Sequence, residues 1–596
     1  MSATLQTAET RTMTGAEIVL QALKDNGVEV IFGYPGGAVL PLYDALFQQN
    51  AIRHILVRHE QAAVHAAEGY ARSTGKVGVV LVTSGPGATN AVTGLVDALM
   101  DSIPVICLTG QVPTHLIGND AFQEADTTGI TRPATKHNYL VKDIRKLAST
   151  VHEAFYVSKS GRPGPVVIDL PKDILIGKGP YSEAPQAPHR SYRPQTEPDM
   201  ASIRAAVRLL KGAKRPIVYA GGGVINAGPE ASRLLGDFVR MANMPCTNTL
   251  MGLGAFPSED PQFLGMLGMH GTYEANLAMH GCDVMLNIGA RFDDRVTGRL
   301  NAFSPNSKKI HADIDPSSIN KNVKVDVAIV GDAGAVLKAL IECWQAEEQP
   351  QDQAAIAEWW RAIDGWRGTG CLQYRQEGSI IKPQHAVKRL YEITREMGHE
   401  TFITTEVGQH QMWAAQYFGF QKPNRWMTSG GLGTMGYGLP AAMGVQIAHP
   451  DALVIDIAGE ASILMNIQEM GTLAQYRLPV KVFILNNEYM GMVRQWQELL
   501  HGSRYSESYS EALPDFVRLA EAFHARGMRV TEASQLDDAI REMIAHPGPV
   551  IADIAVAKDE NCFPMIPSGA AHNEMILAPG QEGGVTGVTD EGKVLV

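Results

Sequence analysis

The chain has 596 residues, which is enough for about three or four domains of ordinary size. Apolar residues make up 45% of the sequence and charged residues 19%, a balance that is typical of folded globular proteins and excludes an extended disordered chain. The net charge of −12 argues against nucleic acid or an anionic membrane as the main partner.

Cysteine usage and hydropathy indicate the compartment. The six cysteines are scattered and form no CxxC pair, so we expect reduced thiols in a cytoplasmic protein. No apolar run reaches 18 residues, which predicts that no segment spans a membrane. The first residues contain no apolar signal core, and we expect residues 1–13 to form a flexible N-terminal tail.

Short apolar runs alternate with helical patterns between residues 14 and 176. We predict one helix over residues 16–26, another after the loop at 33–38, one from 60 to 72 and one from about 89. The predicted strands cover residues 28–32, 55–58, 77–83, 103–109 and 165–170. Repeated strand–helix units of this kind predict a doubly wound, mostly parallel α/β sheet.

The chain then passes through a linker into two further regions. Residues 177–200 contain five prolines and few apolar residues, which predicts a stiffened linker. A second α/β region covers residues 201–345, with predicted strands at 216–220, 284–288 and 309–314. A helical connector over 346–382 leads to a third region, 383–567, whose first predicted strand is 401–405. We expect the glycine-rich tail, 568–596, to be a lid or disordered.

The third region places polar side chains after two predicted buried strands. The first strand, 453–458, is followed by Gly459-Glu460-Ala461 and a helical segment that ends near Tyr476. The second strand, 480–485, stops at Asn486-Asn487. In open α/β sheets, ligands bind beyond the carboxyl ends of the strands. Carboxylate and carboxamide oxygens are the hard ligands that Mg²⁺ takes together with substrate phosphates.

This layout resembles the thiamine diphosphate signature, in which a Gly-Asp-Gly turn is followed by Asn-Asn after the next strand. Here the turn has become Gly459-Glu460-Ala461. Glutamate keeps the charge and the oxygens on a side chain that is longer by one methylene, and Ala461 restricts backbone that glycine would leave free. The alternative is an ordinary strand–helix–strand unit with polar turns.

Glu60 follows the predicted strand at 55–58 and begins a helix. From position alone, a first-turn carboxylate favoured by the helix dipole is the more common role. In thiamine-dependent enzymes a glutamate at the matching place lies against the aminopyrimidine ring, and the resemblance implies that role here. The glycine-rich loops at 33–38 and 84–87 would let backbone approach a ring closely; alternatively, they are simple turns.

Two further elements fit the same ligand. The segment 406–410 follows the predicted strand 401–405, and a glycine-rich loop covers residues 430–436. The resemblance implies that the first holds the diphosphate and that Met435 in the second supports the bent cofactor. Taken singly, His410 would more often be a surface or capping residue and Met435 core filling.

Six motifs together are similar to those of one family, the catalytic (large) subunits of biosynthetic acetohydroxyacid synthases, or acetolactate synthases. They are GYPGGA at 33–38, DAFQE at 120–124, GRPGPVVIDLPK at 161–172, GARFDDRVTG at 289–298, EVGQHQ at 406–411 and NNEYMGMVRQWQ at 486–497. The similarity extends over about residues 14–570. RFDDR resembles the FAD-containing biosynthetic enzymes. The resemblance implies three doubly wound parallel-sheet domains of the thiamine diphosphate-dependent decarboxylase/synthase type, with a pyrimidine-binding, an FAD-binding-type and a diphosphate/Mg-binding domain in that order.

The resemblance also implies site residues. The catalytic set is Glu60, Gln123, Lys172, Arg295 and Trp496. Thiamine diphosphate is met by Tyr34, Pro35, Gly36, Gly37, Glu60, Gly85, Val407, Gly408, Gln409, His410, Gly433, Met435, Gly459, Ala461, Ser462, Asn487, Met490, Gly491 and Met492. Mg²⁺ is held by Glu460, Asn487 and the main-chain carbonyl of Tyr489. FAD is met by Arg162, Gly221, Gly222, Gly223, Thr249, Leu250, Gly268, His270, Gly289, Arg291, Asp293, Arg295, Asp313 and Asp332. The substrate channel is bordered by Phe122, Met269 and Trp496.

The implied reaction decarboxylates pyruvate on thiamine diphosphate and condenses the hydroxyethyl carbanion with a second 2-ketoacid. The acceptor is pyruvate or 2-ketobutyrate, and FAD has no net redox role. Arg295 would meet the acceptor carboxylate with a two-pronged donor, and Trp496 would favour the extra methyl group of 2-ketobutyrate. The implied assembly is a homodimer or homotetramer whose active site is shared between subunits, with a separate regulatory small subunit that binds valine and no nucleic acid or membrane partner.

Three alternatives stay open at this point. One is a flavin- and thiamine-dependent 2-ketoacid oxidase, which would consume oxygen and reduce the flavin stoichiometrically. The second is a glyoxylate carboligase, although relatives of that enzyme lack the catalytic glutamate and Glu60 is present. The third is a catalytically silent flavin-binding assembly subunit whose metal site has decayed at Glu460-Ala461.

Overall fold

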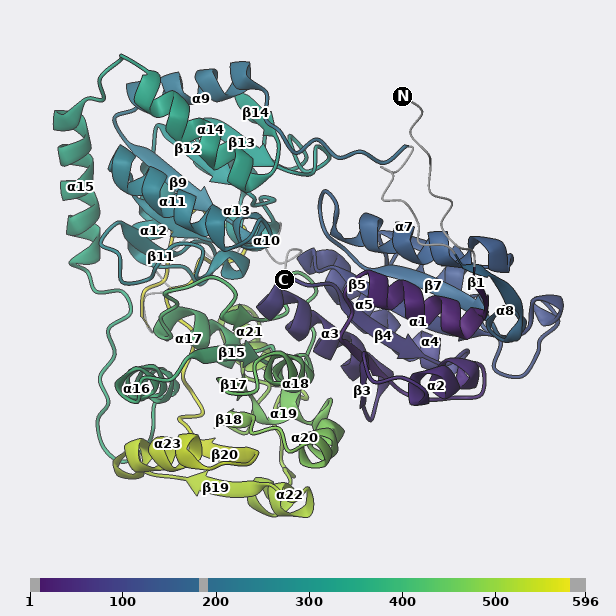
Figure 1. The fold of residues 1–596 in the computed structure, drawn as a ribbon. Coiled ribbons are helices and arrows are strands. Elements are labelled where there is room, and N and C mark those ends of the chain that lie inside the picture. Colours follow the sequence, from purple (N-terminus) through teal and green to yellow (C-terminus); the bar gives the residue numbers. More distant parts are fainter. Residues whose placement is uncertain (1–10, 182–190, 579–596) are drawn as a thin grey trace, which may run out of the picture. The chain divides into compact units, whose positions relative to one another are not determined.

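A computed structural model describes residues 11–181 and 191–578 (Figure 1). The chain divides into two compact units. The first unit contains residues up to Arg193 together with Ser429–Asp451 and Asn466–Leu478, and the second unit contains the rest. Among the described residues, no helix is both long enough and apolar enough to cross a membrane.

The first unit is built on a six-stranded parallel sheet with strand order β3-β2-β4-β5-β7-β6. Its strands are β2 (Val30–Gly33), β3 (Arg53–Leu56), β4 (Gly78–Val82), β5 (Val105–Gln111), β6 (His137–Leu140) and β7 (Val166–Pro171). One face packs against α1 (Gly15–Asp25), α2 (Leu40–Phe47) and α7 (Leu147–Lys159). Helix α3 (Glu60–Thr74) and α5 (Val92–Asp101) also pack in this unit, with α3 against β4. Both sheet faces are buried, which is why its central strands are continuous apolar runs.

Helix α3 has clear start and stop signals. The side chain of His59 caps its first turn by accepting a hydrogen bond from the backbone N–H of Gln61 (3.1 Å), and Gly75 ends the helix in the left-handed conformation (φ +74°). Helix α18 (Gly438–Ala448) packs closely on it. A Cβ atom on Gly444 would lie 1.9 Å from the carbonyl oxygen of Ala66, so this helix contact requires glycine.

The second unit contains two more six-stranded parallel sheets. The middle sheet has the order β11-β10-β9-β12-β13-β14 and consists of β9 (Pro216–Ala220), β10 (Cys246–Asn248), β11 (Phe263–Met266), β12 (Val284–Ile288), β13 (Lys308–Asp313) and β14 (Val327–Val330). The other has the order β16-β15-β17-β18-β20-β19 and consists of β15 (Thr401–Thr405), β16 (Trp426–Met427), β17 (Leu453–Ala458), β18 (Lys481–Asn486), β19 (Arg526–Val530) and β20 (Val550–Ala555).

Helices cover both faces of the middle sheet, as Figure 1 shows. One apolar core joins it to α9 (Met200–Gly212), α11 (Pro229–Ala242) and α14 (Ala333–Ala346). A separate core on the other face joins it to α12 (Tyr273–Gly281) and α15 (Gln353–Arg367), which is part of the predicted helical connector. The last sheet packs against α16 (Pro383–Glu396), α17 (Gln409–Tyr417) and α23 (Leu536–Ala545). The prediction of three parallel-sheet α/β domains is confirmed.

Several predicted elements differ from those observed. The strand expected at 55–58 covers Arg53–Leu56, because an edge strand tolerates polar residues that an apolar pattern misses. The helix expected from about residue 89 begins at Pro86 and is divided into α4 (Pro86–Asn90) and α5. The helical segment expected between 460 and 476 consists of α19 (Glu460–Ile463), a 3₁₀ turn and α20 (Met470–Tyr476).

The expected N-terminal tail and the expected linker contribute to a two-stranded ribbon that was not predicted. Strand β1 (Arg11–Thr14) pairs in antiparallel fashion with β8 (Lys178–Tyr181), so part of each segment is ordered. Proline is tolerated in β8 because this strand is an edge. Residues 182–190 of the expected linker and 579–596 of the expected tail lie outside the described residues. The described part of the C-terminal tail is packed. His572 and Ile576 are buried, and two backbone hydrogen bonds join Met565 and Ile576.

Candidate active site

Two loops of the first unit meet at the point where its strand order reverses. The chain runs from β2 to β3 on one side and then crosses to β4 on the other, so ligands are expected between β2 and β4. Residues 34–37 follow β2, and 84–87 follow β4. A Cβ atom on Gly36 would lie 2.5 Å from the Cβ of Thr83, and one on Gly85 (φ +58°) would lie 2.8 Å from the carbonyl oxygen of Gln123. The predicted residues Tyr34 to Gly37, Gly85 and Gln123 therefore belong to one edge of the sheet.

Glu60 is the first residue of α3 and is half-buried at this same edge. The amide of Asn90 donates a hydrogen bond to its Oε2 (2.9 Å). The backbone that leads into Glu60 is held by Glu469, whose carboxylate accepts from the N–H groups of Arg58 (2.9 Å) and His59 (3.0 Å). Burial raises the pKa of Glu469 to about 7. Asn90 and Glu469 were not identified from the sequence, and both position Glu60.

The other predicted residues of the first unit lie on four further segments. Lys172 begins α8 (Lys172–Ile176) directly after β7, and Phe122 is 89% exposed. Gly433 and Met435 lie in the loop before α18; between them, the backbone N–H of Thr434 donates to Ser429 Oγ (2.8 Å). Arg162 donates to the hydroxyl of Ser102 and to the carbonyl of Leu99, both at the end of α5.

A second strand-order reversal lies between β15 and β17 of the last sheet. Residues 407–410 follow β15, 459–462 follow β17, and Asn487 follows β18. A Cβ atom on Gly459 would lie 2.7 Å from the Nδ1 of His410. The amide nitrogen of Asn487 donates to Gln409 Oε1 (3.2 Å). The structure therefore brings the predicted diphosphate and metal residues together at one edge, as expected for this sheet topology.

Glu460 is the chemically unusual member of this group. It is 1% exposed, and its Oε1 has no hydrogen-bond partner in the described part of the chain. Burial, with smaller contributions from Asp553 and Glu488, raises its pKa to about 8, although the N–H groups of Glu460 and Asn487 act in the opposite direction. A buried carboxylate is costly unless a proton or a cation accompanies it, and its oxygen suits Mg²⁺. The residues therefore fit a divalent metal ion.

His410 and the neighbouring loop offer neutral hydrogen-bonding groups. Burial lowers the pKa of His410 to about 3, so the ring is uncharged, and its Nε2 has no hydrogen-bond partner within the described residues. Asn487 Oδ1 accepts from the N–H of Tyr489 (3.1 Å), which holds the start of the 489–492 loop. A Cβ atom on Gly491, the first residue of the helix that follows, would lie 2.1 Å from Gln409 Oε1, so a larger residue there would displace the Gln409 side chain.

Gln495 is a buried residue of this site that the sequence did not single out. Its Oε1 accepts from Gln409 Nε2 (2.9 Å) and from the N–H of Cys562 (2.8 Å). It thereby ties α21 (Gly491–Leu500) to the loop after β15. Gln495 lies inside the predicted motif 486–497, but the motif does not reveal which side chains face inward. Its neighbour Trp496 is only half-buried.

The middle sheet reverses its strand order between β9 and β12, and its glycines meet there. A Cβ atom on Gly221 would lie 2.2 Å from the carbonyl oxygen of Gly289, and the N–H of Gly223 donates to that oxygen (3.0 Å). Gly222 begins α10 (Gly222–Asn226). A close approach of two glycine loops at such a point is the arrangement that dinucleotides use.

Other predicted flavin residues are held around this edge. Thr249 Oγ1 accepts from the N–H of Gly252 (2.9 Å), Asp332 caps α14 through the N–H of Gly334 (2.9 Å), and Asp313 accepts from the N–H of Asp315 (2.8 Å). The side chain of Asp293 caps α13 (Asp294–Thr297).

Four more of the predicted flavin residues follow β10, β11 and β12. The Leu250 carbonyl accepts from Trp426 (2.9 Å), and Gly268 has a φ of +108°. His270 is buried, which lowers its pKa to about 4, and its Nε2 has no partner among the described residues. Arg291 is half-buried.

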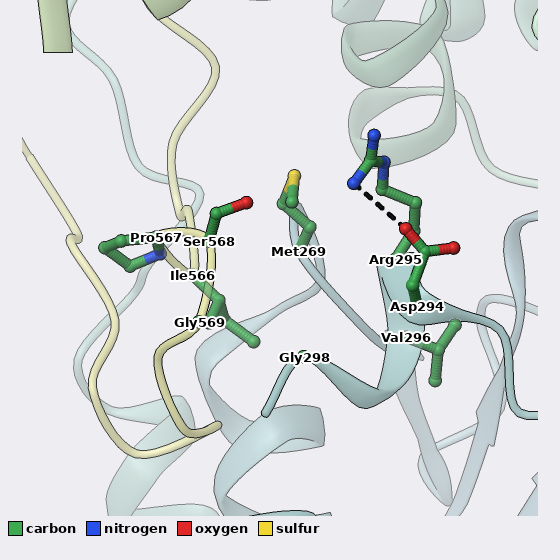
Figure 2. A pocket seen from close by; sticks show the side chains of 9 residues that line it. All are labelled: Met269, Asp294, Arg295, Val296, Gly298, Ile566, Pro567, Ser568 and Gly569. Atoms are coloured by element: carbon green, nitrogen blue, oxygen red, sulfur yellow. Dashed lines mark hydrogen bonds and ion pairs between the residues drawn. The ribbon is translucent and has the colours of Figure 1, made fainter. Parts of the chain in front are cut away.

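A small pocket joins the middle sheet to the C-terminal segment (Figure 2). The predicted residues Met269 and Arg295 line one side, and Arg295 Nη1 lies 3.1 Å from Asp294 Oδ2. Ser568, which the sequence did not identify as a site residue, lines the opposite side with its neighbours in the segment 566–569. Trp496 is not among the residues that line this pocket. A guanidinium at a pocket mouth can meet a carboxylate with paired hydrogen bonds.

The sequence matches three profiles of one enzyme family along its length. They are the thiamine pyrophosphate enzyme N-terminal TPP-binding domain over residues 13–130, the central domain over 203–340 and the C-terminal TPP-binding domain over 406–554. The chain is 50% identical over 571 residues to the acetolactate synthase isozyme 3 large subunit of Escherichia coli, covering 95% of this chain and 99% of that protein. It is 49% identical over 573 residues to the acetolactate synthase large subunit of Haemophilus influenzae (96% and 99% covered). It is 47% identical over 584 residues to an acetolactate synthase of Mycobacterium leprae (97% and 92%).

Proposed function

The chain belongs to the thiamine pyrophosphate enzymes and, within them, to the acetolactate synthase large subunits, and from this premise we propose its reaction and the residues that carry it. It is a transferase that decarboxylates pyruvate and joins the remaining two-carbon unit to a second 2-ketoacid. With pyruvate the product is 2-acetolactate, and with 2-ketobutyrate it is 2-aceto-2-hydroxybutyrate. This is the first common step of valine, leucine and isoleucine biosynthesis.

One observation supports the proposal most strongly. At the strand-order reversal between β15 and β17, a buried Glu460 with an unpartnered oxygen lies in the same loop cluster as His410, Gln409 and Asn487. A fold that only needed to be stable would gain nothing from a carboxylate in this position, because burying it without a counter-charge is costly. A metal ion that binds a diphosphate supplies that counter-charge.

The proposed cofactors are thiamine diphosphate, Mg²⁺ and FAD. When bound, thiamine diphosphate supplies the electron sink that decarboxylation needs. Glu460, Asn487 and the carbonyl of Tyr489 hold Mg²⁺, and the segment 407–410 meets the diphosphate. Ala461 does not prevent this, because it lies inside α19, where the backbone is helical and alanine is unstrained. FAD lies at the paired glycine loops of the middle sheet, and it has no net redox role because the reaction neither oxidises nor reduces its substrates.

Glu60 is the proton-handling residue of this proposal. Asn90 donates to its Oε2 (2.9 Å), and Glu469 holds the backbone that leads into it. Its Oε1 lies beside Gly87 of the loop at 84–87, so the carboxyl group has a defined orientation. There it holds the proton that moves to and from the aminopyrimidine ring. A positioned carboxyl group of this kind contributes roughly 10²–10⁴ to a rate.

The substrate side depends on charge and shape. Arg295 receives the carboxylate of the acceptor, since its planar guanidinium donates two parallel hydrogen bonds. Trp496 offers an apolar face to the acceptor, and Gln123, Lys172, Phe122 and Met269 border the channel. One additional methyl group in an apolar pocket changes the binding free energy of the transition state by about 1–3 kcal/mol. This sets the scale of the preference for 2-ketobutyrate.

The assembly and compartment complete the proposal. The E. coli relative is named a large subunit, and we infer a separate regulatory small subunit for this chain as well. The catalytic chains form a homodimer or homotetramer with the active site shared between subunits. The reduced cysteines, all of which are free, are consistent with a cytoplasmic enzyme.

A colour assay for acetoin tests the reaction. Purified protein is incubated with pyruvate, thiamine diphosphate, Mg²⁺ and FAD, and acid then decarboxylates acetolactate to acetoin. Colour should depend on thiamine diphosphate and should be lost in Glu60→Gln, which retains the cofactor. Absence of product from protein that binds thiamine diphosphate and Mg²⁺ would refute the proposed reaction.

A further inference from the structure

A row of buried polar side chains crosses the middle sheet just below the proposed flavin site. Tyr219 on β9, Asn287 on β12 and His311 on β13 are register partners in adjacent strands. All three are completely buried. Strand interiors that are covered on both faces are normally apolar, so three polar residues in one row call for an explanation beyond packing.

Asn287 is fully used within the protein, whereas its two neighbours are not. The Asn287 amide donates to the carbonyl of Ala290 (2.8 Å), and its Oδ1 accepts from the N–H of the same residue (3.1 Å). The hydroxyl of Tyr219 and both ring nitrogens of His311 have no hydrogen-bond partner among the described residues. Buried polar atoms without partners are rare and costly in native proteins. Phenylalanine at 219 or 311 would avoid that cost.

The loop after β12 lies against this row through Phe292. Phe292 has a φ of +56°, a conformation that is strained for a bulky residue, and is 2% exposed. Its ring centroid lies 5.0 Å from that of His311 and 6.1 Å from that of Tyr219. Strained backbone persists only where its surroundings hold it, and it is concentrated at ligand sites. The loop held in this way carries Arg291 and Asp293, two of the proposed flavin contacts.

Each unpartnered group lies near a charged residue of the proposed flavin site. His311 Nε2 is 3.6 Å from Asp313 Oδ2, while the other carboxylate oxygen of Asp313 accepts from the N–H of Asp315 (2.8 Å). The distance of 3.6 Å is too long for a hydrogen bond but needs only a small movement of Asp313 to close. Burial, together with the charge of Asp293, raises the pKa of Tyr219 well above its usual range, so the hydroxyl keeps its proton and remains a donor.

We propose that Tyr219 and His311 are positioning residues for the flavin: they orient the loop of Arg291 and Asp293 and the carboxylate of Asp313 toward the cofactor, and their polar atoms are satisfied only in the flavin-bound protein. This inference rests on the assignment of FAD in the proposed function. Tyr219 and His311 are not themselves proposed flavin contacts. They lie in the strands beneath those contacts and outside the motif at 289–298.

The proposal predicts opposite effects on stability and on flavin affinity. In His311→Phe the unpartnered ring nitrogens are replaced by an apolar ring, so the flavin-free protein should be at least as stable as wild type. Its dissociation constant for FAD should rise about tenfold, the change expected when one hydrogen bond to a charged group is lost. His311→Gln, which retains a donor, should recover most of that affinity. Tyr219→Phe, which removes only a hydroxyl, should behave like His311→Phe.

The experiment titrates the full-length protein, freed of flavin, with FAD and follows the quenching of flavin fluorescence, with thermal midpoints measured with and without FAD. Ser232→Ala is the matched control, because it also removes a buried unpartnered hydroxyl of this domain but lies on α11 away from the row. Unchanged FAD affinity in both His311→Phe and Tyr219→Phe would overturn the inference, as would equal losses of stability and affinity or a failure of both variants to fold. A wild-type protein that binds no FAD would instead refute the flavin assignment itself.

Discussion

Glu460→Gln tests the metal site by removing a charge while keeping the size of the side chain. In the folded protein without metal, the pKa of Glu460 is raised from its ordinary value of 4.5 to about 8. The folded chain therefore binds this proton more tightly than the unfolded chain does. The stability that it contributes is fully present below pH 4.5 and is lost as the pH rises toward 8.

The magnitude follows from the size of the pKa change. Each pH unit between the two pKa values costs about 1.4 kcal/mol, so wild-type protein without metal should lose on the order of a few kcal/mol across this range. Glutamine has no proton to lose and should not show this loss. Near pH 8 the metal-free variant should therefore unfold at a higher temperature than wild type, by roughly 2–4 °C per kcal/mol for a domain of this size.

Thermal midpoints between pH 5 and pH 8.5, with and without Mg²⁺ and thiamine diphosphate, provide the assay. Wild type should gain stability from the two ligands, and the gain should increase with pH as the carboxylate ionises. Glu460→Gln should lose most of that gain. Glu542→Gln, which alters an exposed ion pair with Arg526 in the same domain, should match wild type throughout. If Glu460→Gln shows the wild-type pH dependence, or if Mg²⁺ stabilises both proteins equally, Glu460 does not hold the metal.

Further predictions address the remaining residues. Glu60→Gln should bind thiamine diphosphate as wild type does but lose about 10²-fold or more in turnover; near-normal turnover would remove Glu60 from its role. Trp496→Leu should lower the preference for 2-ketobutyrate over pyruvate about tenfold, measured as the product ratio in mixed substrates, and an unchanged ratio would exclude Trp496 from acceptor selection. Glu469→Ala should lower both the thermal midpoint and turnover, because the N–H groups of Arg58 and His59 lose their acceptor; unchanged turnover would show that it does not position Glu60.

Strands with clear boundaries could be predicted from the sequence. The strands predicted at 216–220, 284–288, 401–405 and 453–458 are observed with those bounds, because each consists mainly of apolar or β-branched residues and is followed by a glycine or a charged residue. The predicted bounds of the edge strand β3 lie two residues too far along the chain, because Arg53 and His54 are polar and partly exposed. The ribbon of β1 and β8 was missed because its two strands are short and far apart in sequence.

The parts of the site that the sequence did not reveal depend on distant contacts. Glu469 accepts from a backbone group 411 positions away, and no local pattern distinguishes it from an ordinary helix-start carboxylate. Ser568 lines the pocket only because the segment after β20 returns to the middle sheet. Gln495 and Trp496 are neighbours in one motif, and only the orientation of α21 decides that Gln495 is the buried one.

The stoichiometry of the reaction tests the central claim most directly. Pyruvate consumption, carbon dioxide release and oxygen uptake should be measured together on the protein supplied with thiamine diphosphate, Mg²⁺ and FAD. An acetolactate synthase should consume two molecules of pyruvate for each carbon dioxide released and take up no oxygen. One pyruvate per carbon dioxide, with matching oxygen uptake and a reduced flavin, would contradict the assignment and identify an oxidase instead.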